Sequence, residues 1–355
     1  SKKMKVTHGK RAILDEHRNF AFDSAPLPSP DSGEVLVQIS LATVCKSDWH
    51  TWCGHRDSPL PSVLGHEATG TVVALPAEPI FDVNQQLIQL GDQLVWSVFA
   101  VPEEDSLREK GMVQKTPGVR KYGHLALSVA PFSGGFATHI LLEKGTCIAR
   151  LDAAIPPAVA APLNCSLATM VGAFRLAGEP LPSSVAILGC GMLGLHGLAY
   201  AKTLGIRRIA GIDHQSVRLE KAVAFGADQA MSFEAFLASR DTWELILDTT
   251  GATAAMEASI EKLSLGGTAI WVGAVFPSQP VAVNPEKVIR NLLTIKGLHN
   301  YNETDFRRAV AYLQRYYRDF PFETLVNPIL SLEELPTAFE WYRLPQTYRA
   351  GIQPG

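Results

Sequence analysis

The sequence of 355 residues predicts an α/β protein that combines a mainly β part with a doubly wound parallel sheet. Three observations lead to this prediction. Residues 1–165 alternate short β-type runs with glycine and proline turns. Residues 166–300 alternate strand and helix patterns, and an apolar run that ends in a glycine-rich turn opens this second part. We therefore expect one domain over residues 1–165 and another over 166–300.

Short runs rich in apolar and β-branched residues mark the strands of both parts. In the first part they cover 34–42, 68–75, 93–99 and 136–142. In the second part they cover 184–188, 208–212, 245–248, 268–272 and 294–297, with helices between them. The remaining segment adds helical stretches over 303–318 and 332–343 and a β-type run at 328–330.

The glycine-rich turn is Gly189-Cys190-Gly191-Met192-Leu193-Gly194, which follows the apolar run 185–188 directly. In a strand–turn–helix unit this spacing allows a tight turn, lets the backbone approach a pyrophosphate and lets the helix pack on the strand. A second apolar run ends in Asp213, where an acidic side chain accepts hydrogen bonds from ribose hydroxyls and repels a 2′-phosphate. The pattern predicts a dinucleotide site that prefers NAD to NADP. The alternative is an ordinary strand–turn–helix with an acidic loop.

Cys45 and His66 lie in two neighbouring polar motifs, Cys-Lys-Ser-Asp-Trp-His at 45–50 and Gly-His-Glu at 65–67. A thiolate and an imidazole are the ligand types that select zinc, and a catalytic zinc needs three protein ligands. The Ser47 hydroxyl and the His50 imidazole lie close to Cys45 in sequence, where a proton relay would begin. The alternative is a loop cysteine and a buried structural histidine.

Taken together, the two motifs resemble the zinc-containing medium-chain dehydrogenase/reductase family of alcohol and polyol dehydrogenases. The resemblance covers essentially the whole chain and implies a GroES-like catalytic domain plus a Rossmann coenzyme domain. It also implies that residues 301–355 return to the first domain. The implied reaction is hydride transfer between a small alcohol or aldehyde and NAD.

The same resemblance implies the site residues. Cys165, in Asn-Cys-Ser-Leu-Ala-Thr at 164–169, takes the place of the third zinc ligand, beside Cys45 and His66. Asp48 would orient His66, and Glu67 would be a carboxylate that can transiently approach the metal. Ser47 would accept the hydroxyl proton and pass it toward His50.

On the coenzyme side, the loop glycines and Asp213 are joined by several further residues. Gly273 and Ala274 match the loop beside the nicotinamide ring, and Arg349 matches an arginine that binds pyrophosphate. The remaining residues predicted to bind the cofactor are Met192, Leu193, Thr169 and Arg218.

One departure from the family concerns the number of metal ions. Members with a structural zinc carry four closely spaced cysteines in the region that corresponds to residues 97–134, and this chain has no cysteine there. We therefore expect one catalytic zinc and no structural zinc.

Composition narrows the class of protein. A net charge of −3 with scattered signs argues against a nucleic-acid partner. The most apolar stretch, 159–174, is interrupted by polar residues and proline, and no apolar segment follows the charged N-terminus, so we expect neither a membrane span nor a signal peptide. The five cysteines form no disulfide framework. These features predict a cytoplasmic enzyme, and the family implies a homo-oligomer, a dimer or a tetramer.

The substrate is predicted from the residues that follow His50. In the family this segment approaches the substrate, and here it contains Trp52 and Arg56. An arginine there could bind a phosphonate, phosphate or carboxylate group, and the alternative is a solvent-facing loop charge. The motifs also resemble a branch of the family associated with phosphonate catabolism, which implies a hydroxyalkyl phosphonate.

Other functions remain open at this point. One alternative is a general alcohol or polyol dehydrogenase of the sorbitol or threonine type. Alternatives from other classes are a zinc-free reductase, a binding-only relative, or a lyase that uses bound NAD without net turnover. The intact Cys45, His66 and Cys165 set, together with the Ser47 and His50 relay, argues against these last three.

Overall fold

The computed structural model describes residues 5–103 and 107–355 and shows two compact units. Residues 1–4, on which the expectation of no signal peptide rests, lie outside the described residues. The first unit comprises the chain up to Cys165 with Asn302–Tyr317 and Phe322–Gly355, and the second comprises Ser166–Tyr301 with Arg318–Pro321. Tyr301 and the short stretch Arg318–Pro321 thus belong with the second unit, although we expected residues 301–355 in the first.

The first unit is mainly β, as predicted. Its elements up to Cys165 are β1 (His8–Leu14), β2 (Phe20–Pro26), β3 (Val35–Thr43), α1 (Lys46–Trp52), β4 (Glu67–Ala74), β5 (Gln93–Ala100), η1 (Val113–Lys115), β6 (Arg120–Lys121), β7 (His139–Leu142), β8 (Thr146–Arg150), α2 (Pro157–Ala160) and η2 (Ala161–Asn164). The C-terminal segment adds α9 (Glu303–Tyr316), η3 (Phe322–Leu325), β15 (Val326–Ser331), η4 (Leu332–Glu334), α10 (Leu335–Trp341) and β16 (Arg349–Gln353).

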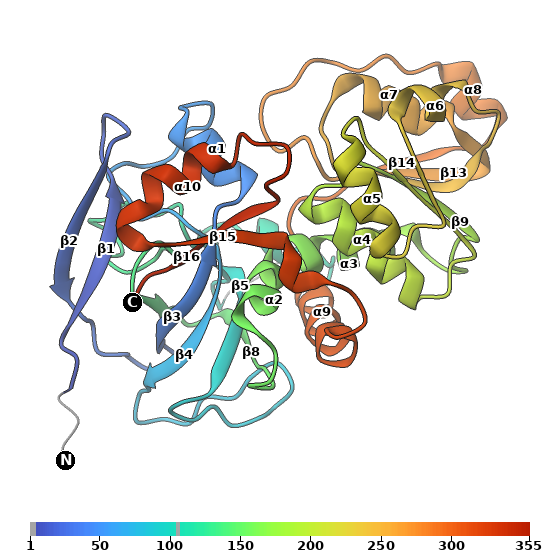
Figure 1. The fold of residues 1–355 in the computed structure, drawn as a ribbon. Coiled ribbons are helices and arrows are strands. Elements are labelled where there is room, and N and C mark those ends of the chain that lie inside the picture. The colour runs from blue at the N-terminus through green and yellow to red at the C-terminus, as the bar shows by residue number, and fades with distance from the viewer. Residues whose placement is uncertain (1–4, 104–106) are drawn as a thin grey trace. The chain divides into compact units, whose positions relative to one another are not determined.

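One sheet brings the two ends of this unit together. Its strand order is β15-β16-β3-β4-β5-β6, with β7 paired to β3 and β8 paired to β5. Figure 1 shows the red strands β15 and β16 beside the blue strand β3. β16 pairs antiparallel with the end of β3, and that end pairs with the beginning of β4. The sheet therefore gathers residues near 43, 67 and 350 at one place.

The second unit is a parallel sheet with helices between successive strands. Its elements are α3 (Ser166–Ala177), β9 (Ser184–Leu188), α4 (Met192–Thr203), β10 (Arg208–Ile212), α5 (Ser216–Ala224), β11 (Gln229–Met231), α6 (Phe233–Ala238), β12 (Trp243–Asp248), α7 (Thr253–Glu261), β13 (Leu263–Trp271), α8 (Pro285–Arg290) and β14 (Thr294–Gly297). All five strand pairings are parallel, in the order β11-β10-β9-β12-β13-β14. Because the chain leaves β9 in both directions, this sheet is doubly wound, and the predicted fold class is confirmed.

Each unit has its own apolar core. In the first, Trp96, Phe136 and Phe339 are fully buried in one cluster with the residues of β3, β4 and β5. In the second, Trp243 and Phe236 pack with the apolar residues of β9, β10 and β12. Buried strands of this kind read as continuous apolar runs, which explains why 184–188 and 208–212 were predicted with their observed bounds.

Within the described residues, no single helix is long and apolar enough to cross a membrane. One bent pair, Pro157–Asn164 with Ser166–Ala177, passes the same test by length and composition only.

The close packing of α4 on β9 gives a first prediction. A Cβ atom on Gly194 would overlap the Gly189 carbonyl and lie 2.8 Å from its carbon atom. Gly194→Ala should therefore lower the free energy of unfolding of the second unit by about 1–3 kcal/mol, as overpacking does. Gly297→Ala is the matched control, because a Cβ there meets no atom within 4 Å. Urea unfolding compares the two variants, and equal stabilities would contradict the packing argument.

Candidate functional site

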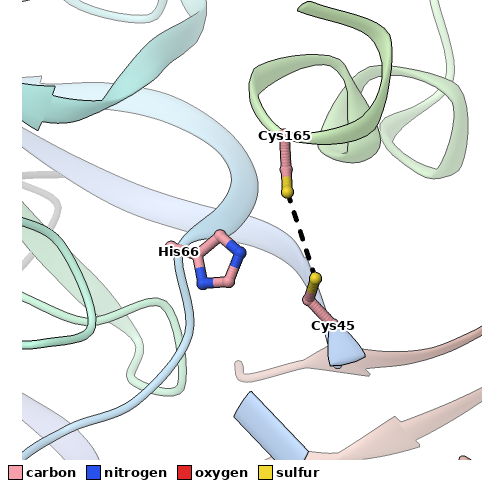
Figure 2. Close-up of side chains that lie close together, drawn as sticks. All are labelled: Cys45, His66 and Cys165. Carbon is pink, nitrogen blue, oxygen red and sulfur yellow. Dashed lines mark hydrogen bonds between the residues drawn. The ribbon is translucent and has the colours of Figure 1, made fainter. Parts of the chain in front are cut away.

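The candidate metal ligands come from three places in the first unit. Cys45 caps the N-terminus of α1, His66 directly precedes β4, and Cys165 directly follows η2. Their ligand atoms all lie within 4.8 Å of one another, and among residues 5–103 and 107–355 no other group of three such side chains does so. Figure 2 shows the two thiols and the imidazole turned toward a common point.

The geometry fits a tetrahedral metal site. The Cys45 and Cys165 sulfur atoms are 4.0 Å apart. Two thiolates bound at the usual zinc–sulfur distance in a tetrahedron would be separated by about 3.8 Å. Two sulfurs and one imidazole are the donor set of a catalytic zinc that keeps one position open. The residues present therefore fit the ion that the sequence predicted.

The electrostatics of the thiols suit a cation. The pKa of Cys45 is held well below its usual value, because Cys165 donates to its sulfur and Arg349 and His66 lie close to it. The same contact raises the pKa of Cys165, since its thiol faces the Cys45 thiolate. A bound cation would stabilise the thiolate form of both cysteines.

Asp48 connects two of the three ligands. It is fully buried, and its Oδ2 accepts a hydrogen bond of 2.9 Å from the backbone N–H of Cys45. Its Oδ1 lies 3.4 Å from Nδ1 of His66. Burial by itself lowers the pKa of His66, but the contacts with Asp48 and Cys45 together outweigh burial and raise it. A carboxylate on Nδ1 leaves Nε2 for the metal, which is the orienting role predicted for Asp48.

Glu67 is fully buried beside the ligands and pairs with Arg349. Its Oε1 accepts hydrogen bonds from Thr43 at 2.6 Å and from Nε of Arg349 at 2.8 Å. Nη2 of Arg349 lies 3.4 Å from Oε2 of Glu67 and 3.6 Å from the Cys45 sulfur. Burial raises the pKa of Glu67, and Arg349 acts in the opposite direction. Glu67 is thus held by Arg349 and lies outside the ligand cluster, and its role as a transient ligand stays a prediction.

Arg349 itself is only 4% exposed, at the beginning of β16. We predicted that it binds pyrophosphate, and this role stays a prediction. Its contacts with Glu67 and Cys45 were not foreseen. No signal in the sequence joins residues 282 positions apart, and only the sheet pairing β16-β3-β4 reveals the contact.

The predicted relay residues lie on α1. Ser47 is half-buried in its first turn, and Nδ1 of His50 lies 3.2 Å from Nδ1 of His55. Burial, Lys46, His55 and Arg56 lower the pKa of His50, and Cys45 acts in the opposite direction. Trp52, predicted at the substrate site, packs its ring against Phe339 of the core at a centroid distance of 5.5 Å. Arg56 is half-buried in the loop after α1.

His124 was not among the predicted residues. Its ring stacks on the His66 ring, with centroids 5.9 Å apart and an interplanar angle of 25°. The stacking depends on a close backbone approach, because a Cβ on Gly123 would lie 2.8 Å from the Gly65 carbonyl oxygen. Sequence analysis missed this contact because nothing in the sequence pairs Gly65 with Gly123.

In the second unit the glycine-rich turn joins β9 to α4. Gly189 has a φ of +98°, and Gly191 is the N-cap of α4, whose N-terminus carries a partial positive charge. Asp213 lies at the end of β10, and its Oδ2 accepts a hydrogen bond of 2.8 Å from the backbone N–H of Cys190. Arg218 lies against the same turn, 3.1 Å from the position that a Cβ on Gly191 would take.

The other residues predicted to bind the cofactor come from several elements of the second unit. Met192 and Leu193 form the first turn of α4, and Thr169 is buried in α3. Gly273 follows β13 and packs so closely on Gly251 that it leaves no room for a side chain, and Ala274 comes next. The structure thus brings Asp213 and Arg218 to the turn, and cofactor binding by the whole set stays a prediction.

Comparison with known proteins places this geometry in a family. The zinc-binding dehydrogenase model matches residues 193–315, and the model of the alcohol dehydrogenase GroES-like domain matches residues 31–152. The chain belongs to the zinc-containing medium-chain dehydrogenase/reductase family of alcohol dehydrogenases. Its first unit is therefore a GroES-like domain and its second is of the Rossmann type, as the sequence predicted.

Several relatives span almost the whole chain. The chain is 24% identical to 5-exo-hydroxycamphor dehydrogenase from Pseudomonas putida, over 94% of this chain and 96% of that protein. It is 27% identical to sorbitol dehydrogenase from Ovis aries, over 91% of this chain and 90% of that protein. The crystal structure of an alcohol dehydrogenase from Thermotoga maritima has a TM-score of 0.90 at 26% identity, covering 98% of this chain and 100% of that one.

The buried pair of Glu67 and Arg349 gives a second prediction. Arg349→Met should lower the free energy of unfolding of the zinc-free chain by about 3–5 kcal/mol, because it leaves a buried carboxylate without its cation. Urea unfolding measures the change. The double variant Glu67→Gln/Arg349→Met should recover part of the loss, since no buried charge remains.

The control for this prediction is Arg290→Met. Arg290 forms an exposed ion pair with Glu286, and its loss should cost no more than about 0.5 kcal/mol. A similarly small loss in Arg349→Met would mean that the buried pair adds no stability.

Proposed function

We propose that this protein is a zinc- and NAD-dependent dehydrogenase that transfers hydride between a small alcohol and NAD, forming an aldehyde or ketone. The observation that supports the proposal is the convergence of Cys45, His66 and Cys165 on one point. Asp48 contacts the backbone of Cys45 and the ring of His66. One zinc per chain is expected, since residues 97–134 contain no cysteine.

The predicted site residues of the first unit bind the metal ion and transfer the proton in this scheme. Zinc bound by Cys45, His66 and Cys165 would polarise the alcohol oxygen and lower its pKa. Ser47 accepts the hydroxyl proton, and His50, whose pKa is lowered mainly by burial, takes it toward the surface. The 3.2 Å contact of His50 with the exposed His55 extends this path by one side chain.

The second unit supplies the cofactor site. NAD would accept the hydride, and the protein contributes binding and orientation. The backbone of the turn at Gly189 and Gly191 and the N-terminus of α4 bind the pyrophosphate, and Asp213 binds the adenosine ribose. Gly273 and Ala274 lie beside the nicotinamide, and a pyrophosphate contact of Arg349 belongs to the same proposal. We also propose a homo-oligomer.

For the substrate we propose an alcohol with an anionic group, of which a hydroxyalkyl phosphonate is one example. Arg56 supports this, because it is half-buried close to His50, whose pKa it lowers. Alcohols and polyols without charge are the other candidates, since sorbitol dehydrogenase is among the relatives of this chain.

The proposal is tested by removing one ligand. Cys165→Ala should lose zinc and the formation of NADH from alcohols, but it should still bind NAD because the glycine-rich turn is untouched. Cys147→Ala is the control, since Cys147 is a buried thiol outside the ligand cluster. Elemental analysis and the absorbance of NADH give the two readouts. Full zinc content in Cys165→Ala, or two zinc ions in the unchanged chain, would refute the assignment.

Asp213 gives a prediction about the cofactor. Asp213→Gly should narrow the preference for NAD over NADP by about 10- to 100-fold, because a 2′-phosphate no longer meets a carboxylate. The ratio of kcat/KM for the two cofactors measures it. The control is Asp228→Gly. Asp228 is an exposed acid that accepts a hydrogen bond from the backbone N–H of Ile209 in β10 and pairs with Lys202. Equal kcat/KM for NAD and NADP in the unchanged enzyme would show that the Asp213 carboxylate does not contact the adenosine ribose.

A further inference from the structure

Asn164 is a buried polar residue that directly precedes the candidate ligand Cys165. It is the last residue of η2, and none of its surface is exposed. Its Nδ2 donates a hydrogen bond of 2.9 Å to the backbone carbonyl of His66, which lies 98 positions earlier in the chain. One amide therefore connects the backbone beside Cys165 with the backbone of the ligand His66.

The turn that carries Asn164 is fixed in the core of the first unit. All four residues of η2 are buried, and this helix packs on β4 and β5. The backbone N–H of Cys165 donates to the Pro162 carbonyl at 3.3 Å, so the ligand continues the same turn. The positions of Asn164 and Cys165 are therefore coupled, and a shift of one shifts the other.

The segment that carries His66 is held by hydrogen bonds outside the ladder of the sheet. His66 precedes β4 without being part of it. The carbonyl of Gly65 accepts the backbone N–H of Gly135 at 2.7 Å. The carbonyl of His66 is the next along the chain, and there the donor is the side chain of Asn164. The place of the His66 backbone thus depends on this amide.

Two buried side chains together connect the three candidate ligands. Asp48 contacts the backbone of Cys45 and the ring of His66. Asn164 contacts the backbone of His66 from the position beside Cys165. Asp48 orients the imidazole, whereas Asn164 holds the backbone that carries it. Ligands that are held at the right separation before the ion arrives bind it with a smaller entropic cost.

We propose that Asn164 is a positioning residue of the metal site, which sets the separation of His66 and Cys165 and thereby the affinity for zinc. The inference rests on the proposed function, which supplies zinc as the ion. Asn164 acts through the two ligands and not on the ion itself. Because its amide is neutral, it holds the backbone without adding charge beside two thiolates. Contacts that support metal ligands from outside typically change metal affinity by about 10- to 100-fold.

The test compares two buried side chains that each donate to a backbone carbonyl. Asn164→Leu keeps the approximate volume of the side chain and removes the amide. Thr69→Val is the matched control, because the fully buried Thr69 hydroxyl donates to the Leu94 carbonyl at 2.8 Å and neither residue adjoins a candidate ligand. Both variants should unfold at lower urea concentration than the unchanged zinc-free chain, since each loses a buried hydrogen bond.

The affinity for zinc separates positioning from stability. Competition with a chelator on the full folded chain should show zinc binding about 10- to 100-fold weaker in Asn164→Leu, and within about threefold of the unchanged protein in Thr69→Val. One zinc should still bind per chain at saturation, because all three ligands remain. Cobalt bound in place of zinc should change its visible spectrum in Asn164→Leu only, since the spectrum reports the ligand geometry. Asn164→Ser, whose side chain is too short for the contact, is measured in case Asn164→Leu does not fold.

Three results would overturn the inference. They are a zinc affinity that changes less than about threefold in the Asn164 variants, equal losses of zinc affinity in Asn164→Leu and Thr69→Val, and an unchanged cobalt spectrum in Asn164→Leu. The proposed function fails separately. If zinc binding weakens as expected but the unchanged protein forms no NADH from any alcohol, Asn164 positions the ligands of a metal site with another function. If alcohols yield NADH and the variants keep their zinc affinity, the dehydrogenase stands without the positioning role.

Discussion

The ion pair between Glu67 and Arg349 joins the sheet of the first unit to the cluster of Cys45, His66 and Cys165. Both side chains are almost completely buried, and the guanidinium also lies 3.6 Å from the Cys45 sulfur. One cation therefore compensates a carboxylate on β4 and favours the thiolate form of Cys45, the N-cap of α1. Because a buried carboxylate without a partner is costly, the pairing of β16, β3 and β4 and the electrostatics of the site are coupled.

Two aspartates use the same arrangement in the two units. Asp48 accepts a hydrogen bond from the N–H of Cys45, and Asp213 accepts one from the N–H of Cys190. In each case a carboxylate fixes the backbone of a segment for which we propose a ligand, a metal ion at Cys45 and a dinucleotide at Cys190. The second oxygen of Asp48 faces His66, and that of Asp213 accepts the N–H of Gln215. Each carboxylate thus shapes its loop before any ligand arrives, which lowers the entropic cost of binding.

The sequence predicted those parts of the molecule whose signals are local. The strands 184–188 and 208–212 are continuous apolar runs, and Asp213 follows its strand directly, so periodicity and spacing sufficed. A helix was expected between the strands 184–188 and 208–212, and it begins at Met192, since the glycine-rich turn itself supplies its N-cap. The ligand Cys165 came only from the resemblance to a family. The stacking of His124 on His66 and the pairing of Arg349 with Glu67 join distant segments through the sheet, and no pattern within one segment encodes them.

The distance along the chain between Glu67 and Arg349 has a consequence for synthesis. Ribosomes deliver the N-terminal residues first, and the partner of Glu67 follows 282 residues later. At usual rates of elongation the interval is roughly 15–60 s, during which Cys45, His66 and Asp48 are already outside the ribosome. Until β16 arrives, burying Glu67 is unfavourable, so β4 lacks its final packing. The surroundings of Cys45 and His66 therefore reach their final packing only after β16 has been synthesised.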